Sequence, residues 1–169
     1  MQSEADPEQV ARTILLRKLE AAPRTRRELE DVLRKRNIPD DVAELVLDRF
    51  SDVGLINDVE FANAWVGSRQ RGKGLAPRAL ADELRRKGVD AEVIRDVLDQ
   101  LGDEEIEAAG RTLVRKKLRS MSGVSRETAT RRLVSMLARK GYPAGLAYRI
   151  VAQELPDYRD ESASMVVNE

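Results

Sequence analysis

The sequence predicts an all-α protein, an elongated tandem array of three three-helix repeats with about nine helices and no sheet. The first observation is a repeated segment of 15 residues that begins at Leu33, Leu84 and Leu137, so that its copies lie 51 and 53 residues apart. The second is a set of helix start and stop signals at matching places in each repeat. The third is the lack of a long run with period two, the pattern of a strand. A near-constant period indicates one supersecondary unit used in tandem.

The repeat period divides the chain into five segments. The predicted boundaries are a polar N-terminal segment 1–9, three-helix repeats 10–56, 57–102 and 103–156, and an acidic disordered tail 157–169. Repeats of about 50 residues are marginal as independent domains, so neighbouring repeats are expected to share buried surface. Arrays of this kind usually bind along an extended partner, which argues against catalysis.

In the first repeat, capping residues and prolines mark three helix starts, and turn-forming residues mark two of the helix ends. The predicted starts are Asp6 with Pro7, a capping box from Thr25 to Glu28, and Pro39. The predicted ends are Glu20, Asn37 and Gly54. Asn37 stands where the other two repeats have a glycine, the usual residue after a helix end.

The second repeat follows the same order, and its helices carry clear apolar stripes. The predicted starts are a capping box from Asn57 to Glu60, Pro77, and Asp90 as an N-cap. The predicted ends are the stretch from Gln70 to Gly74, then Gly88 and Gly102. The apolar positions at helical spacing are Phe61, Ala64 and Trp65, then Leu80 and Leu84, then Val93, Val97, Leu98 and Leu101.

The third repeat has the same signals for its last two helices. Ser125 is the expected cap of its second helix and Gly141 its end, while Pro143 opens the last helix and Pro156 stops it.

The composition excludes several classes of protein. The chain has no cysteine and no histidine, which removes disulfides, thiolate nucleophiles, imidazole metal ligands and the usual general base near pH 7. We therefore expect no catalytic residues, no cofactor and no metal, and we do not expect an enzyme. The N-terminal residues are polar and acidic, unlike a signal peptide. No apolar run approaches the ~20 residues that span a bilayer, so we expect a cytoplasmic protein without membrane contact.

Charge is balanced overall but segregated along the chain. Residues 69–87 contain seven bases against two acids, residues 90–107 eight acids against one base, and residues 111–140 ten bases against one acid. A single charged residue on a helix is most simply a solvated side chain or one that complements the helix dipole. The bases of a run with one acid among ten bases repel one another unless an anion neutralises them. DNA phosphate is the commonest such anion.

These basic blocks supply the candidate contacts to nucleic acid or to an acidic protein surface. The candidates are Arg69, Arg71, Lys73, Arg78, Arg85, Arg86, Lys87, Arg111, Arg115, Lys116, Lys117, Arg119, Arg131, Arg132, Arg139 and Lys140.

Three helices with a tight turn before the last one suggest a helix-turn-helix, but the charges oppose its usual role. A recognition helix that enters the major groove is normally basic. Here the third helices of the first two repeats are acidic, with Asp40, Asp41, Glu44 and Asp48 in one and Asp90, Glu92, Asp96 and Asp99 in the other. Contacts to nucleic acid are therefore expected to involve the backbone without sequence specificity, while the acidic helices face solvent or a basic protein surface.

Three smaller motifs are interpreted as structural. The stretch from Gly72 to Gly74 lacks the strand and spacing of a phosphate loop, and is expected to be a flexible connector. Phe61 and Trp65 are expected in the core, with an exposed stacking platform as the less favoured alternative. Tyr142 takes the place of an aliphatic residue in the other repeats, which predicts packing.

One stretch, continued by the later turns, carries a family resemblance. It runs from Gly54 through Phe61-Ala62-Asn63-Ala64-Trp65 and Lys73-Gly74 to the turn Leu84-Arg85-Arg86-Lys87-Gly88. Together with Leu137 to Tyr142, this order and spacing resembles the bacterial RecX regulatory family. The resemblance covers roughly residues 10–155 and is strongest between 54 and 101. The departures are modest: Asn57 stands where many relatives have an acid, and Asn37 replaces a glycine.

The resemblance implies a cytoplasmic modulator of the RecA recombinase. Members bind RecA and RecA–single-stranded DNA filaments, and they typically inhibit the ATPase, strand exchange and coprotease activities of RecA, which affects recombination, DNA repair and the SOS response. The resemblance assigns no catalytic residues to this chain. We expect a monomer that contacts RecA, with nonspecific nucleic-acid contact. Two alternatives remain: a nonspecific DNA-binding protein without a recombinase partner, and a helical scaffold for an unrelated protein.

Overall fold

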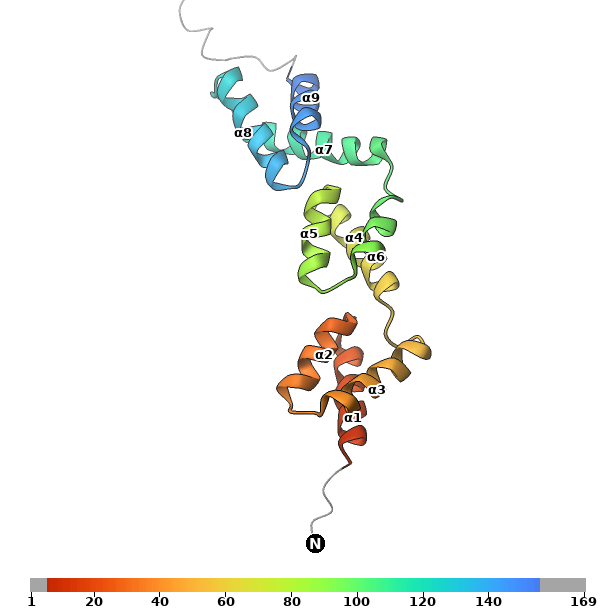
Figure 1. Ribbon diagram of the computed structural model, residues 1–169. Coiled ribbons are helices and arrows are strands. Elements are labelled where there is room, and N and C mark those ends of the chain that lie inside the picture. Colours follow the sequence, from red (N-terminus) through yellow and green to blue (C-terminus); the bar gives the residue numbers. More distant parts are fainter. Residues whose placement is uncertain (1–5, 156–169) are drawn as a thin grey trace, which may run out of the picture. The chain divides into compact units, whose positions relative to one another are not determined.

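The computed structural model describes residues 6–155, which form nine α-helices and no strand, as predicted (Figure 1). The helices are α1 (Pro7–Ala21), α2 (Arg26–Lys35), α3 (Asp40–Asp52), α4 (Asp58–Lys73), α5 (Pro77–Arg86), α6 (Ala91–Leu98), α7 (Asp103–Leu118), α8 (Arg126–Arg139) and α9 (Ala144–Glu154). The predicted disordered tail 157–169 and the helix stop at Pro156 lie outside the described residues.

Contacts group the chain into two compact units. Unit 1 comprises residues 1–65 and 83–97, and unit 2 comprises residues 66–82 and 98–169. The three unit boundaries fall inside α4, inside α5 and before the last residue of α6. The predicted repeat boundaries after residues 56 and 102 stay a prediction.

The predicted caps explain where several helices begin. Asp6 accepts a hydrogen bond from the backbone N–H of Glu8 at the start of α1. Thr25 and Glu28 form a complete capping box at α2, each side chain accepting from the backbone of the other. Two further predicted caps each accept from the backbone N–H three residues on: Asn57 at α4 and Ser125 at α8. Each of these bonds satisfies a backbone donor that a helix start leaves unpaired.

Each copy of the repeated 15-residue segment contains a helix-ending turn and continues into the next helix. After α8, Tyr142 N–H donates to the carbonyl of Leu137, and Gly141 N–H donates to that of Ala138. This is the bonding of a Schellman motif, which requires a left-handed residue directly after the helix cap. The equivalent residues after α5 and α2 are Gly88 and Asn37, and their φ angles of 80° and 57° lie in the same left-handed region. The motif joins a leucine to an apolar residue five positions later, which accounts for the repeated pattern.

The same turns tie consecutive repeats together. In unit 1 the hydroxyl of buried Thr25 donates to the carbonyl of Lys87, at 2.6 Å. In unit 2 the backbone N–H of Ala76 donates to the carbonyl of Lys140, at 2.9 Å. In both cases the residue before the second helix of one repeat binds the carbonyl of the residue directly after the second helix of the next repeat.

Close packing at these joints explains why two of the turns use glycine. A Cβ at Gly88 would lie 2.4 Å from the Cβ of Arg27, and a Cβ at Gly141 would lie 2.5 Å from the backbone nitrogen of Ala79. The corresponding Asn37 is exposed. An asparagine tolerates the left-handed conformation, and at an exposed position its side chain has room.

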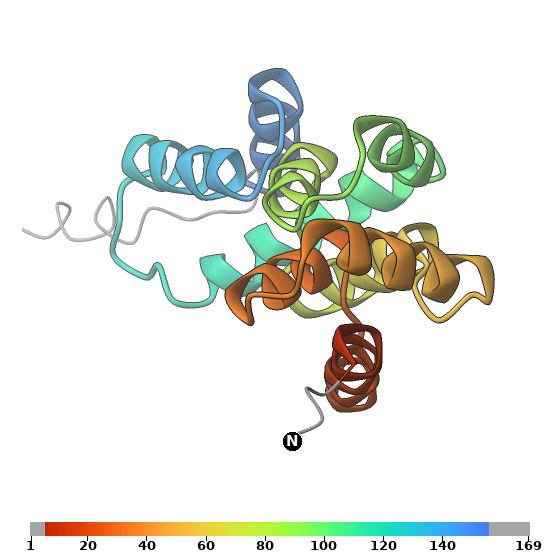
Figure 2. The same ribbon diagram turned by 60° about the horizontal axis from the view of Figure 1, so that its bottom comes forward.

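Each unit has a core of aliphatic side chains. In unit 1, α1, α2 and α3 pack together around Leu15, Leu29, Leu33 and Val46. In unit 2, α7 and α8 both pack against α9, with a sharp turn between α8 and α9 (Figure 2). The core of unit 2 includes Val114, Leu133, Leu137, Ile150 and Val151, each with no exposed surface.

The prediction of a flexible connector at residues 72–74 is wrong. Gly72 and Lys73 form the last turn of α4. The carbonyl of Lys73 accepts from the Lys140 ammonium, and the carbonyl of Gly74 accepts from the Tyr142 hydroxyl, both at 2.9 Å. These donors lie 67 and 68 residues away in the sequence, so local pattern alone did not reveal the anchoring.

Several predicted helix limits need small corrections. Pro39 and Pro143 are the N-caps of α3 and α9, one residue before each helix. The helix predicted to end at Gly102 ends at Leu98, because Gly102 is already the N-cap of α7. The most buried side chains of α6 include Ile94, which the predicted apolar stripe had omitted.

Tyr142 packs in the core, as predicted, and its burial makes the stability of the fold depend on pH. Burial raises the pKa of its phenol to about 12, and the hydroxyl donates to the carbonyl of Gly74. In an unfolded chain the phenol ionises near pH ~10. Between these values the unfolded state binds fewer protons than the folded state. The free energy of unfolding therefore falls as pH rises, by about 1.4 kcal/mol for each pH unit.

Tyr142→Phe is expected to remove this pH dependence. At pH 8 the variant should be less stable than the wild type by about 1 kcal/mol, because it lacks the hydrogen bond. Near pH 11 the difference should largely vanish, since only the wild type loses stability through the phenol. Urea denaturation of both proteins at the two pH values measures this, with the other titrating groups common to both. A constant difference would contradict the prediction.

Candidate nucleic-acid interface

A groove beside α8 gathers four exposed bases, three from α8 and one from α7. The groove has a volume of about 440 Å³ and lies between α7 and α8 of unit 2. It is lined by Lys117, Arg131, Arg132, Ser135, Met136 and Arg139. The residues from α8 recur at helical spacing, so they share one face of that helix.

The opposite face of α8 holds this surface in place. Ala129, Leu133 and Leu137 follow each other at intervals of four residues and are fully buried in the core of unit 2. The side chains of Arg131, Arg132 and Arg139 are consequently directed away from the core, and all three residues are exposed. The buried stripe thus fixes which side chains line the groove.

The four bases of the groove have no acidic partner within residues 6–155. The structure gives no ion pair or side-chain hydrogen bond to Lys117, Arg131, Arg132 or Arg139 there. Four positive charges in one groove raise its electrostatic potential and favour an anion. The geometry suits a phosphate backbone, which arginine and lysine bind through charge-assisted hydrogen bonds.

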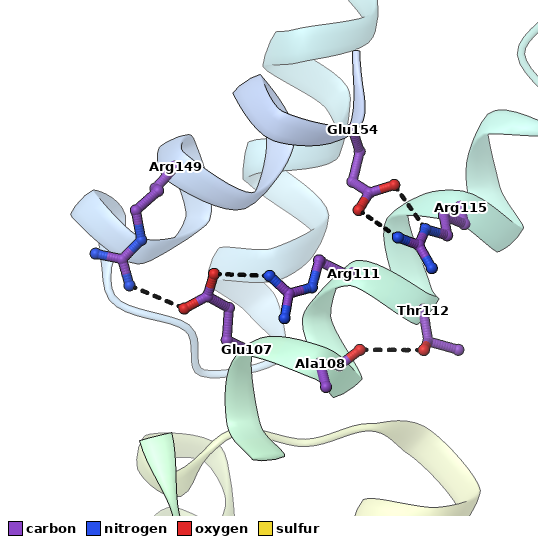
Figure 3. A network of polar contacts seen from close by, with 7 residues as sticks. All are labelled: Glu107, Ala108, Arg111, Thr112, Arg115, Arg149 and Glu154. Carbon is purple, nitrogen blue, oxygen red and sulfur yellow. Dashed lines mark hydrogen bonds and ion pairs between the residues drawn. The ribbon is translucent and has the colours of Figure 1, made fainter. Parts of the chain in front are cut away.

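A polar network within the third repeat removes two predicted contacts from this surface (Figure 3). Arg115 binds Glu154 of α9 through two hydrogen bonds of 2.7 and 2.9 Å, and this raises the pKa of Arg115 above its ordinary value. Glu107 accepts from Arg111 at 3.0 Å and from Arg149 of α9 at 3.1 Å. These bonds tie α7 to α9. Arg111 and Arg115 therefore have a structural role that their charge alone did not indicate.

Four other predicted contacts are also engaged within the fold. Lys87 binds Glu28 at 2.8 Å and lies 5.0 Å from the ring centroid of Trp65. Lys140 donates to the carbonyl of Lys73. Arg69 and Arg85 take part in interactions of the fold as well.

The remaining predicted contacts are exposed and have no ion pair among the described residues. Within unit 2, Lys116 directly precedes Lys117 in the last turn of α7, and Arg119 is the C-cap of that helix. Arg78 lines a different cavity of about 430 Å³, beside Pro143 and Arg149. The structure does not place the others in the groove; they are Arg71, Lys73 and Arg86.

The predicted packing of Phe61 and Trp65 agrees with the contacts of unit 1. Phe61 is buried, and its ring stacks on that of Trp65 with centroids 5.7 Å apart. The indole N–H of Trp65 donates to Glu83 at 2.8 Å. Trp65 is thus held by Phe61, Glu83 and Lys87, and it offers no open platform for a base.

The acidic third helices are exposed, as predicted. Asp40, Asp41 and Glu44 of α3 lie on the surface of unit 1, and so does Asp48, which binds Arg26 at 2.6 Å. Asp90, Glu92, Asp96 and Asp99, in and beside α6, are exposed as well.

Charge patterns alone missed two surface features. Ser135 and Met136 belong to the basic groove, and their helical spacing from Arg132 was the available signal. Unit 1 has an apolar groove of about 360 Å³ lined by residues that include Leu19, Leu55 and Phe61. Leu55, one of these lining residues, is 50% exposed.

Family models cover most of the chain. The first three-helix domain of RecX matches residues 11–50, the second matches residues 57–98 and the third matches residues 103–151. The chain belongs to the RecX family of regulatory proteins.

Comparison with individual relatives supports the same family. The chain is 55% identical over 145 residues to the regulatory protein RecX of Thermobifida fusca, covering 86% of this chain and 78% of that protein. It is 54% identical over 157 residues to the regulatory protein RecX of Streptomyces lividans, covering 93% and 84%. The crystal structure of RecX from Lactobacillus salivarius matches with a TM-score of 0.82 at 26% identity, over 89% of this chain and 97% of that one.

The described residues of this RecX-family chain show no metal site and no membrane span. No group of three or more acidic side chains within residues 6–155 is arranged to hold a metal ion. None of the helices in this range is both long and apolar enough to cross a bilayer.

Proposed function

We propose that this chain binds RecA and RecA–single-stranded DNA filaments and inhibits the ATPase, strand exchange and coprotease activities of RecA. In this role it modulates homologous recombination, DNA repair and the SOS response as a cytoplasmic monomer without catalytic activity. Family membership supports the partner. The observation that carries the mode of action is the groove of four bases without acidic partners.

In this proposal the basic groove of unit 2 contacts DNA phosphates in the filament. Arg131, Arg132 and Arg139 bind along the backbone, and Lys117 adds a fourth charge. The exposed acids of α3 and α6 face basic protein surface of RecA. With DNA and protein bound together, the chain blocks the second DNA strand and stops the filament from cycling.

Titration into preformed RecA–single-stranded DNA filaments tests the proposal. We expect ATP hydrolysis to fall when far less than one molecule is present for each RecA protomer, because a bound chain affects neighbouring protomers. The alternative is a nonspecific DNA-binding protein without a recombinase partner, which the same basic groove would serve. Unchanged hydrolysis, in salt where the chain still binds bare DNA, would favour that alternative.

A further inference from the structure

The apolar groove of unit 1 has no part in the proposed DNA contact. It has a volume of about 360 Å³, and its lining includes Leu19 near the end of α1, Leu55 between α3 and α4, and Phe61 and Ala64 of α4. All of these residues belong to unit 1. The volume lies within the range of ~300–1,000 Å³ that is usual for ligand pockets. The groove is therefore large enough to receive side chains of a bound molecule.

Exposed apolar side chains are concentrated in the segment that lines this groove. Within residues 6–155 six large apolar side chains are markedly exposed, and three of them, Val53, Leu55 and Val59, fall in one short segment. Leu55 lines the groove, and the two valines are 71% and 49% exposed. Single exposed apolar residues are common on soluble proteins, whereas a group of them marks a contact surface. Covering this group with apolar side chains of a partner would release water and favour binding.

The groove also contains a base that the fold leaves without an acceptor. Arg24 lines the groove, and its Nε is buried without a hydrogen-bond partner among the described residues. No ion pair within residues 6–155 includes Arg24. A buried donor without an acceptor costs free energy, so such groups usually have a partner. A carboxylate suits a guanidinium best, because it can accept from two of its N–H groups at once.

Two polar residues of the lining limit the kind of acid that fits. The side-chain oxygen of Asn57 accepts from the backbone N–H of Glu60 at 3.1 Å, so its amide nitrogen is the group that can donate to a ligand. Glu60 is exposed and lines the groove as well. Its negative charge opposes a polyanion such as DNA, which would bring several charges into the groove. The lining thus favours a single carboxylate next to apolar side chains.

We propose that this groove binds a segment of a partner protein in which a single aspartate or glutamate lies next to aliphatic or aromatic side chains. The apolar side chains cover Leu55 and Phe61, and the carboxylate accepts from the guanidinium of Arg24. The proposal concerns a protein contact of unit 1 and does not depend on the DNA contact proposed for unit 2. Because apolar burial supplies most of the binding energy, salt should weaken this contact much less than a contact with DNA.

Selection from a phage-displayed library of random peptides tests the groove without a known partner. Peptides that bind the full chain are kept only if they fail to bind the Leu55→Asp variant, which places a charge in the apolar lining. Leu55 is half exposed, so this variant should keep the fold, which thermal denaturation checks. We expect the retained peptides to share an acid next to aliphatic or aromatic residues. No enrichment, or enriched peptides without this acid, would overturn the proposal.

Fluorescence anisotropy with the most enriched peptide tests the carboxylate contact. We expect Arg24→Gln to weaken binding by about tenfold or more, since hydrogen bonds to charged groups contribute more than neutral ones. An amide in place of the acid of the peptide should weaken binding to the wild type equally, and Arg24→Gln should then cause little further loss. Arg17→Gln removes the same charge from an exposed base of α1 outside the groove, and it should bind like the wild type. Equal losses in the two variants would contradict a contact with Arg24.

A carboxylate placed in the groove gives a third measurement. Asn57→Asp should keep the start of α4, because aspartate caps helices as well as asparagine does. The new carboxylate offers Arg24 an acceptor within the chain and repels the acid of the peptide. We expect several-fold weaker peptide binding, and unchanged or tighter binding would overturn the proposal. If the chain failed to inhibit RecA, the proposed function would fail, while these peptide measurements would still decide what the groove binds.

Discussion

Replacing Arg131, Arg132 and Arg139 by glutamate is expected to weaken binding to single-stranded DNA by about 100-fold or more at ~0.1 M salt. Each phosphate contact to a single strand contributes ~0.7 to the slope of log affinity against log salt. Loss of three contacts should therefore reduce this slope by ~2. Anisotropy of a labelled oligo(dT) at several salt concentrations measures both values. The fold should persist, because these side chains have no partner among the described residues.

A matched variant tests whether position matters more than net charge. Arg17, Lys35 and Arg36 are exposed bases of unit 1, have no ion pair among the described residues, and do not belong to the groove. Their replacement by glutamate changes the net charge by the same amount. We expect only a small, salt-sensitive loss of DNA affinity. Equal losses in the two variants would show that overall charge, and not the groove, determines binding.

The same pair of variants bears on RecA. If the groove reaches DNA within the filament, the groove variant should inhibit ATP hydrolysis far less than the wild type, while the unit 1 variant keeps most of its effect. Full inhibition by the groove variant would separate RecA binding from DNA binding, and it would place the protein contact elsewhere on the chain. Arg115→Glu is a poor substitute, because it breaks the bond to Glu154 that ties α7 to α9.

Local chemistry explains why most of the fold was predictable. The bonds that start a helix lie within three residues, so Thr25 with Glu28, and Ser125, could be assigned from spacing alone. The turns after α2, α5 and α8 are also local, because a Schellman motif needs only one left-handed residue and two backbone bonds. The turns recur at nearly constant intervals although corresponding helices differ in length, such as the 13 residues of α3 and the 8 of α6.

Partners remote in sequence explain what was not predictable. The bond from Arg115 to Glu154 crosses 39 residues, and the bond from Lys140 to Lys73 crosses 67. A count of charges cannot distinguish bases that are bound within the fold from bases that are not. Arg131 and Arg132 are of the second kind, because they have no acidic partner among the described residues. The pair of Glu107 with Arg111, four residues apart, was visible as helical spacing. The contacts of the fold thus engage six of the sixteen candidates, and four of the others line one groove.

Gly141→Ala is expected to destabilise unit 2 by about 3 kcal/mol or more, which corresponds to a fall of about 6–12 °C in Tm. Gly141 has a φ of 93°, a left-handed conformation that costs a residue with a Cβ ~1–2 kcal/mol. The added Cβ would also lie 2.5 Å from the backbone nitrogen and 2.8 Å from the Cβ of Ala79. A backbone neighbour cannot rotate away, so the joint between Ala76 and Lys140 has to open.

Two further glycines separate the contributions to this loss. Gly123 has a φ of 75° but open space around it, so Gly123→Ala should cost only the conformational ~1–2 kcal/mol. Gly145 lies in the first turn of α9 with open space and no left-handed φ, so Gly145→Ala should leave stability unchanged or raise it by about 0.5–1 kcal/mol. Thermal denaturation of the three variants measures the series.

The ranking of these variants decides what the repeated glycine does. If Gly141→Ala and Gly123→Ala lose the same stability, then the left-handed turn alone requires the glycine, and the close approach to Ala79 has relaxed without cost. If Gly141→Ala loses clearly more, the glycine is required because the next helix start packs directly on the turn. The second outcome would also explain why an asparagine can stand at position 37. Its turn requires the left-handed conformation, but the residue is exposed.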